Sequence, residues 1–355
     1  MMLPTEQVGS IPRPAALIEG IQDFEARRIS QPELNALYHS AVQDTIQRLE
    51  ATGSPVITDG EQAKHSFATY SIYGLETLAP DGMPISFADG HIRNFPRITA
   101  GPFRYKTPAD VYLEIAQRYA HVPLKQAVAS ASALSLLYPQ GGIPGYSREQ
   151  YLDALIAEQE GEIRRCLRKG AHVVQMDFTE GRLSLKLDPT RRLLHSFIDL
   201  NNLVLERFSA EERKRLGVHT CPGADRHSSH SAEVDYAELL PRLFELQATN
   251  FYIQLASEPD RKRVLKMIRE HAKDEQRIFV GVIDPLDPRV ETPEEVRDRV
   301  LEAAEYIPID RLGTTDDCGF APFADDTSRT RETAFEKIRA RVAGTALASK
   351  VLGLE

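Results

Sequence analysis

Eight short apolar segments, most of them followed by an amphipathic stretch, constrain the fold of this 355-residue chain more than any other feature. We expect strands at residues 6–8, 55–58, 124–129, 171–176, 215–220, 250–255, 278–283 and 312–314. Strands that alternate with helices predict a parallel sheet. Eight such repeats in a chain of this length favour an α/β fold of the closed (β/α)8 (TIM) barrel type over an open doubly wound sheet.

Helical patterns fill most of the intervals between these segments. Apolar residues recur at helical spacing, and Thr292 followed by Pro293 and Glu295 is typical of a helix start. We expect helices at residues 17–24, 31–51, 109–120, 148–169, 193–208, 236–246, 261–271, 293–306 and 330–351. The predicted alternation of strand and helix therefore covers nearly the whole chain.

One stretch, at about residues 62–106, fits no βα unit. It is rich in glycine, proline and aromatic residues, and long irregular excursions of this kind are usually functional loops or lids. We expect an inserted hairpin or lid after the second strand, over one end of the barrel. Because no linker divides the sequence, residues 1–355 are expected to form a single domain.

Composition narrows the class of protein. Apolar residues make up 42% and charged residues 27% of the chain, as in soluble globular proteins. The formal net charge of −9 argues against nucleic acid or an anionic membrane as partner. No signal peptide or membrane span is evident, and three cysteines suggest reduced thiols. We therefore expect a cytoplasmic protein, with a homodimer as a compatible assembly.

Active sites of such barrels lie at the C-terminal ends of the strands. There, His219 and Cys221 lie two residues apart and point to the same face of an extended strand, and Cys318 follows the eighth strand. One imidazole and two thiolates suit zinc with an open coordination position, where a substrate thiol would be deprotonated. The alternative is that these three are a hydrogen-bonded core histidine and two small buried residues.

A second group at the strand ends consists of Ser10, Glu61 and Asp177. A hydroxyl and two carboxylates at one rim would suit a substrate ammonium group. The alternative is that they cap helices and end loops, which is the commoner use of such residues.

Five segments together resemble a known family. They are residues 8–14, 59–61, 174–177, 218–221 and 317–320, read VGSIPRP, DGE, VQMD, VHTC and DCGF. They are similar to the Gly-Ser-Phe-Pro, His-Gly-Glu and Gln-Ile-Asp segments and the two zinc-ligand segments of the catalytic half of cobalamin-independent methionine synthase. The chain resembles the short, single-barrel form of that family.

The resemblance implies a methyltransferase whose zinc is held by His219, Cys221 and Cys318. A thiol such as homocysteine would bind as its thiolate and take a methyl group from a folate or a corrinoid protein. Asp177 would serve catalysis and, with Ser10, Glu61 and Gln254, bind the amino-acid substrate.

Three positions depart from the family pattern. Gln254 stands where the family places a glutamate ligand, with Glu258 nearby, and Phe178 follows Asp177 where the family has Glu-Pro. The chain has no tryptophan to stack on a folate, so Phe178, Tyr138 or Tyr146 is expected to replace it. These departures leave the methyl donor and the thiol open.

Three other functions remain open from the sequence. One is a zinc-dependent alkyltransferase acting on another thiol. Another is a metal-free barrel enzyme of the uroporphyrinogen decarboxylase type, for which Arg13, Arg93 and Arg97 would bind a polyacidic substrate. The last is a non-catalytic relative that binds zinc or a metabolite. Gln254, which replaces the glutamate ligand of the family, is the feature that supports it.

Overall fold

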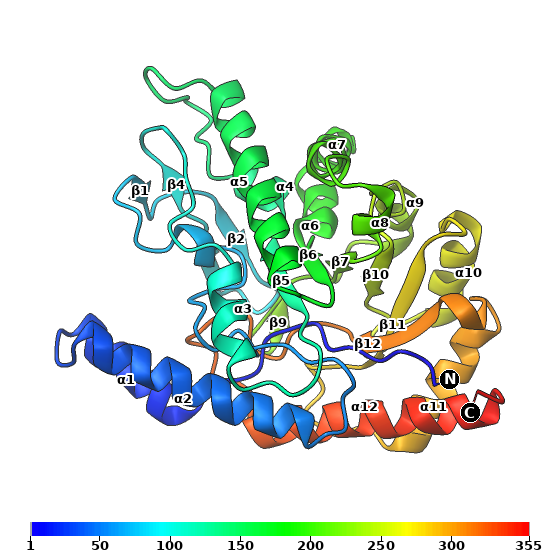
Figure 1. Cartoon of the computed structure of the whole chain (residues 1–355). Coiled ribbons are helices and arrows are strands. Elements are labelled where there is room, and N and C mark those ends of the chain that lie inside the picture. The colour runs from blue at the N-terminus through cyan, green and yellow to red at the C-terminus, as the bar shows by residue number, and fades with distance from the viewer. Residues whose placement is uncertain (1, 355) are drawn as a thin grey trace.

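The computed structural model describes residues 2–354 and is built around a six-stranded parallel sheet (Figure 1). The strands run in the order β12-β11-β10-β7-β6-β5. Their bounds are β5 Gln126–Ala129, β6 Val174–Asp177, β7 Leu216–Thr220, β10 Asn250–Ile253, β11 Arg277–Ile283 and β12 Leu312–Asp316. Almost every residue of these strands is buried, because helices and barrel interior cover both faces of a parallel sheet.

The first two predicted strands close the sheet without becoming regular strands. Thr5 makes a single parallel bridge to Thr314 at the β12 edge, and Ile57 makes one to Leu124 before β5. Pro4 precedes the first bridge and Pro55 the second, and a proline has no N–H to add to a ladder.

These two segments also contact each other. The Ile11 N–H donates to the Gly60 carbonyl at 3.0 Å, and the Thr58 hydroxyl donates to the Gly9 carbonyl at 2.9 Å. All eight predicted segments therefore follow one another around a ring. The (β/α)8 barrel is confirmed, and two of its eight strand positions are irregular.

Helices surround this barrel as the sequence pattern predicts. The long ones are α1 Ala15–Glu25, α2 Gln31–Glu50, α3 Asp110–Gln117, α5 Arg148–Arg168, α7 Arg192–Leu205, α10 Arg261–His271, α11 Pro293–Ala304 and α12 Arg331–Val351. Shorter elements that the sequence analysis missed are α4 Ala131–Ser135, α6 Glu180–Leu187, α8 Ala210–Arg213 and η3 Ile309–Arg311. None of the helices described is long and apolar enough to cross a bilayer.

The predicted helix at 236–246 is wrong. A 3-10 turn, η2 Tyr236–Glu238, and a short helix, α9 Leu240–Leu243, occupy the region instead. Pro241 lies in the first turn of α9 and has no N–H to donate to the preceding turn, so α9 and η2 do not join into one helix.

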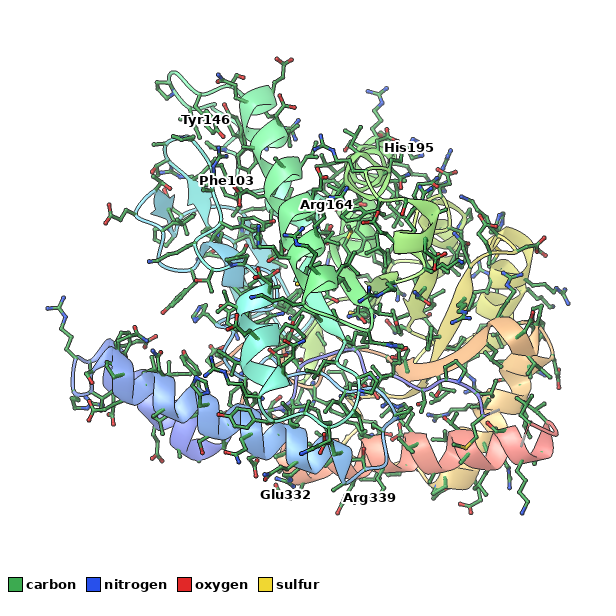
Figure 2. All side chains as sticks on the ribbon, in the orientation of Figure 1. Phe103, Tyr146, Arg164, His195, Glu332 and Arg339 are labelled. Atoms are coloured by element: carbon green, nitrogen blue, oxygen red, sulfur yellow. The ribbon has the colours of Figure 1, made fainter. Side chains whose placement is uncertain are left out.

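The insertion after the second strand forms two nested antiparallel pairs and one 3-10 turn. Strand β1 Leu78–Ala79 pairs with β4 Arg97–Ile98, and β2 Pro84–Ser86 pairs with β3 Ile92–Asn94; η1 spans Tyr70–Ile72. The predicted hairpin is therefore present. Its return segment is attached to the loop before α5, where the Phe103 N–H donates to the Tyr146 hydroxyl at 3.1 Å (Figure 2).

Candidate active site

Strand register sets the level of the site. Asp177 at the end of β6 is the partner of His219 on β7, and His219 is the partner of Tyr252 on β10. Paired residues of adjacent strands point to the same side of a sheet. This strand register places the Asp177 carboxylate and the His219 imidazole on the same side of the sheet and at the same height in the barrel.

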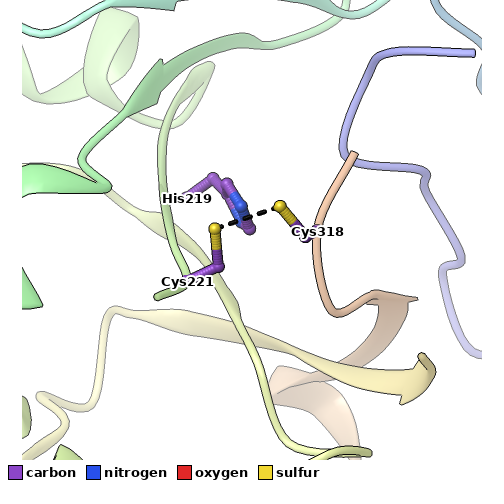
Figure 3. A group of neighbouring side chains, drawn as sticks. All are labelled: His219, Cys221 and Cys318. Atoms are coloured by element: carbon purple, nitrogen blue, oxygen red, sulfur yellow. Dashed lines mark hydrogen bonds between the residues drawn. The ribbon is translucent and has the colours of Figure 1, made fainter. Parts of the chain in front are cut away.

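The structure brings His219, Cys221 and Cys318 together (Figure 3). Their ligand atoms all lie within 4.8 Å of one another, and the two Sγ atoms are 3.1 Å apart. All three side chains are buried. An ion with bonds of about 2.0 to 2.3 Å spans up to about 4.3 Å between a nitrogen and a sulfur ligand, so small side-chain shifts bring all three ligands within its reach.

The orientation of His219 fits a metal ligand. Its Nδ1 lies 3.2 Å from the Tyr252 carbonyl, which can only accept a hydrogen bond, so Nδ1 carries the proton. Nε2 is buried and has no hydrogen-bond partner. A backbone carbonyl that fixes the tautomer of a histidine is the usual support for a metal-binding ring nitrogen.

The two thiols are hydrogen-bonded to each other, and this contact shifts their pKa values in opposite directions. The hydrogen bond from Cys221 lowers the pKa of Cys318 well below its ordinary value, with the His219 ring acting in the same direction. Burial raises the pKa of Cys221, and its hydrogen bond to Cys318 raises it further. A thiolate, a thiol and a free imidazole nitrogen form a nitrogen–sulfur donor set that zinc favours. The residues present therefore fit a zinc ion.

A small cavity beside this trio joins the two predicted groups. Ser10, Glu61 and Asp177 line it together with His219 and Cys318. Cys221 and Gln254 are not in its wall.

Ser10 is held at that wall by the loop after β12. Its hydroxyl oxygen accepts from the Ala321 N–H at 3.2 Å. A Cβ at Gly319 would lie 2.2 Å from that oxygen, so only glycine allows the loop to approach so closely.

The carboxylates of the small cavity are buried and interact. Burial raises the pKa of Asp177 to about 7; the nearby His219 opposes this rise and the charge of Glu61 adds to it. Glu61 Oε1 accepts from Lys64 Nζ at 2.9 Å, and both side chains are buried. Sequence analysis missed Lys64, whose only signal was its position three residues after Glu61.

Gln254 lies at the end of β10, outside the small cavity wall. Its amide nitrogen donates to the Ser257 hydroxyl at 2.7 Å, while its carbonyl oxygen is buried without a partner. Glu258 forms a buried ion pair with Arg182 at 2.7 Å. The ion pair therefore holds the Glu258 carboxylate at the α6 helix, away from the thiols.

A larger cavity of about 470 Å³ adjoins the small one. Phe67, Thr179, Gly223 and Ala224 line both. Most of its wall comes from the insertion, and its aromatic residues are Phe67, Tyr73, Phe87, Phe95 and Phe323.

The aromatic residues expected to stack on a ligand lie elsewhere. Phe178 is fully buried and packs where a Cβ on Gly181 would be. The Tyr138 hydroxyl donates to the Tyr146 carbonyl at 2.7 Å, and neither tyrosine lines the cavity. Since the sequence does not reveal how the insertion folds back, the aromatic residues of the insertion were missed.

His230, which the sequence analysis did not use, is buried and lines the larger cavity beside Gly223. Gly223 has φ +67°, and a Cβ there would lie 1.8 Å from His230 Nε2. Burial lowers the pKa of His230 to about 4, so the ring is neutral at physiological pH. The turn after Cys221 thus needs glycine both for its backbone angle and for its contact with His230.

Fold and site define a (β/α)8 barrel enzyme with a buried histidine–dicysteine centre next to a carboxylate-lined cavity. The model of the family "Cobalamin-independent synthase, Catalytic domain" matches residues 3–345. The chain belongs to this family and is a methyltransferase.

Similar proteins match most of this chain. A methionine synthase of Saccharolobus islandicus is 22% identical over 344 residues, which cover 97% of this chain and 94% of the relative. A 5-methyltetrahydropteroyltriglutamate–homocysteine methyltransferase of Nitratidesulfovibrio vulgaris is 23% identical, covering 89% of this chain but 38% of the longer relative. The structure of a B12-independent methionine synthase from a Shewanella species in complex with selenomethionine superimposes with a TM-score of 0.80 at 20% identity, covering 100% of both chains.

Proposed function

We propose that this enzyme uses zinc to transfer a methyl group from a methyltetrahydrofolate-type donor to the thiol of homocysteine. The observation that carries the proposal is that the cavity lined by Ser10, Glu61 and Asp177 is also lined by two of the three candidate metal ligands. The names of the relatives supply the substrate pair.

The acceptor is bound through its charge. Two carboxylates, Glu61 and Asp177, face one small buried space, where like charges repel. An ammonium group between them adds a second cation beside Lys64, which already pairs with Glu61, and gives Asp177 a charged donor in addition to the Gln175 amide. Homocysteine has this ammonium group near its thiol, which then lies toward Cys318.

The thiol is activated at the trio. Zinc bound by His219, Cys221 and Cys318 would act as a Lewis acid that keeps the substrate sulfur deprotonated at neutral pH. The Tyr252 carbonyl keeps His219 in the tautomer that leaves Nε2 free. Gln254 does not line the small cavity, and its proposed contact with the substrate rests on its buried carbonyl oxygen, which has no hydrogen-bond partner.

The donor approaches from the larger cavity. The shared wall of Phe67, Thr179, Gly223 and Ala224 is where the two cavities meet, so a methyl carbon there faces the sulfur. Holding the two reactants in line lowers the entropic part of the barrier.

The metal-free decarboxylase alternative is disfavoured by where its arginines lie. Arg13 is buried and donates to the Glu61 and Lys64 carbonyls at 2.7 and 3.0 Å, whereas Arg97 pairs with Asp81 at the surface. Arg93 is occupied by two aspartates, Asp225 and Asp325. The three arginines therefore do not form one site for a polyacid.

Zinc content tests the proposal. Purified enzyme is expected to contain about one zinc per chain and to methylate homocysteine, and Cys221→Ser and Cys318→Ser should each lose both properties. Cys166→Ala is the matched control, because Cys166 is equally buried but belongs to the apolar core. Full methyltransferase activity in protein that elemental analysis shows to be free of metal would contradict the proposal.

A thiol panel tests the acceptor. Homocysteine should be used at least about 100-fold more efficiently than 4-mercaptobutanoate, which lacks only the ammonium group, since two buried carboxylates would be left without it. Equal use of both thiols would exclude the proposed role of Glu61 and Asp177. We also propose a cytoplasmic location, which fits a chain whose cysteines are all free thiols.

A further inference from the structure

Glu180, the first residue of α6, presents one unused carboxylate oxygen at the larger cavity. Its Oε1 accepts hydrogen bonds from the hydroxyls of Ser130 and Ser132. Its Oε2 is buried and has no partner, and the side chain lines the cavity. Ser132 is itself fixed by Asn201, whose amide nitrogen donates to it at 2.8 Å. The carboxyl group therefore has a fixed orientation before any ligand binds.

A second buried carboxylate in the same molecule makes Glu180 informative. Glu162 Oε1 accepts from the Ala109 N–H at 2.6 Å and from the Tyr70 hydroxyl at 2.9 Å, and its Oε2 also lacks a partner. Burial raises the pKa of each to about 7. The difference that matters for ligand binding is their position: Glu180 lines the 470 Å³ cavity and Glu162 does not.

The rest of the cavity wall supplies little charge. Its one arginine, Arg93, pairs with Asp225 at one side and with Asp325 at 2.8 Å at the other. Burial lowers the pKa of both His65 and His230, so these rings are neutral at physiological pH. Within residues 2–354, the wall therefore contains no lysine or arginine free to bind an anion.

We propose that Glu180 determines donor specificity, because its Oε2 accepts a hydrogen bond from a ring N–H of the methyl donor while the donor's anionic tail stays outside the cavity. This inference rests on the proposed methyl transfer and names the residue that reads the donor. Methyl donors of this class combine a planar ring system that has N–H groups with a chain of glutamates. The apolar wall and the single acceptor match the ring, and a polyanionic tail finds no partner there.

The contact also explains an otherwise costly arrangement. A buried acceptor without a partner is unfavourable, and a charge-assisted hydrogen bond from the ligand removes that cost on binding. Because the donor N–H favours the ionised form of Glu180, donor affinity should fall as pH falls through about 7. The other titratable groups of the wall are His65, His230 and the paired Arg93, and a Glu180 variant leaves their contribution in place.

Donor binding to the zinc-loaded enzyme tests the proposal. The probes are the mono- and triglutamate forms of 5-methyltetrahydrofolate, with Kd measured by titration calorimetry from pH 6 to pH 8.5. Glu180→Gln should raise Kd about 10- to 100-fold and flatten its pH dependence, because an amide NH2 opposes the ring N–H. Glu180→Asp, which keeps the charge but shortens the side chain, should give a smaller loss. Zinc content and the KM for homocysteine should stay unchanged in both.

Glu162→Gln is the matched control and should bind the donor as wild type does, since its carboxylate lies away from the cavity. The mono- and triglutamate probes should bind wild type with Kd values within about threefold of each other, because the cavity wall has no free cation to bind the glutamate tail. Equal Kd values for Glu180→Gln and Glu162→Gln, or a triglutamate preference above about tenfold, would overturn the proposal while methyl transfer still stood. A wild-type enzyme that methylates homocysteine from neither probe would overturn the proposed function, and the assignment of Glu180 with it.

Discussion

The two adjoining cavities are built in opposite ways. The small cavity takes its polar groups from the ends of parallel strands, where Glu61, Asp177, His219 and Cys318 meet in fixed register. The large cavity takes most of its wall from the irregular insertion and is mainly apolar. The difference shows that the strand ends of the barrel position the charged and metal-binding groups, whereas the insertion provides the shape of the larger cavity.

The largest effect should separate the two cavities. Asp177→Asn removes one of the two carboxylates that line the proposed acceptor cavity, and the KM for homocysteine should rise about 100-fold because a charged hydrogen-bond partner is lost. Donor Kd should not change. Steady-state kinetics in homocysteine, together with donor titration, checks this; a parallel loss of donor affinity would show that the two cavities do not act separately.

A smaller effect concerns the buried carboxylates themselves. Burial raises the folded-state pKa of Glu162 to about 7 from an ordinary value near 4.5, so its share of the unfolding free energy is fully present below pH 4.5 and is lost as pH rises to about 7. Glu162→Gln should remove that slope and gain about 2 kcal/mol relative to wild type at pH 8. Urea unfolding at pH 4.5 and pH 8 measures the difference; equal gains at both pH values would contradict the assignment.

The smallest effect concerns how the insertion is attached. Arg93 on β3 bridges Asp225, four residues after Cys221, and Asp325, seven after Cys318. Arg93→Ala should raise the donor KM about five- to tenfold and speed hydrogen exchange at residues 84–94, because the hairpin loses its tie to both loops.

Arg97→Ala is the control for that tie, since Arg97 lies on the same insertion but pairs only with Asp81 at the surface. Its donor KM and its exchange rates should match those of wild type. An Arg97→Ala variant that behaved like Arg93→Ala would mean that any loss of charge loosens the insertion.

Sequence periodicity predicted the parts of the molecule that local patterns determine. His219 and Cys221 share a face because strand residues alternate, and Cys318 joins them because parallel strands end at one rim. The segments at 6–8 and 55–58 are less regular than predicted, because prolines interrupt their ladders. The homodimer remains a prediction.

Residues that depend on distant packing were missed. Lys64, Glu180 and His230 are buried only because the insertion and the loops after β6 and β7 fold over them, and no local pattern encodes that burial. The aromatic wall was assigned to Tyr138, Tyr146 and Phe178 for the same reason. Gln254 was placed at the correct strand end, and its free carbonyl oxygen became visible only with the side-chain contacts.

The four residues common to both cavities are the sole place where the two cavity walls coincide among the residues described. Phe67 belongs to the insertion, whereas Thr179, Gly223 and Ala224 belong to loops that follow the strands. Substitutions confined to residues 62–106 should therefore change which methyl donor fits, while Asp177 and the three candidate metal ligands stay in place.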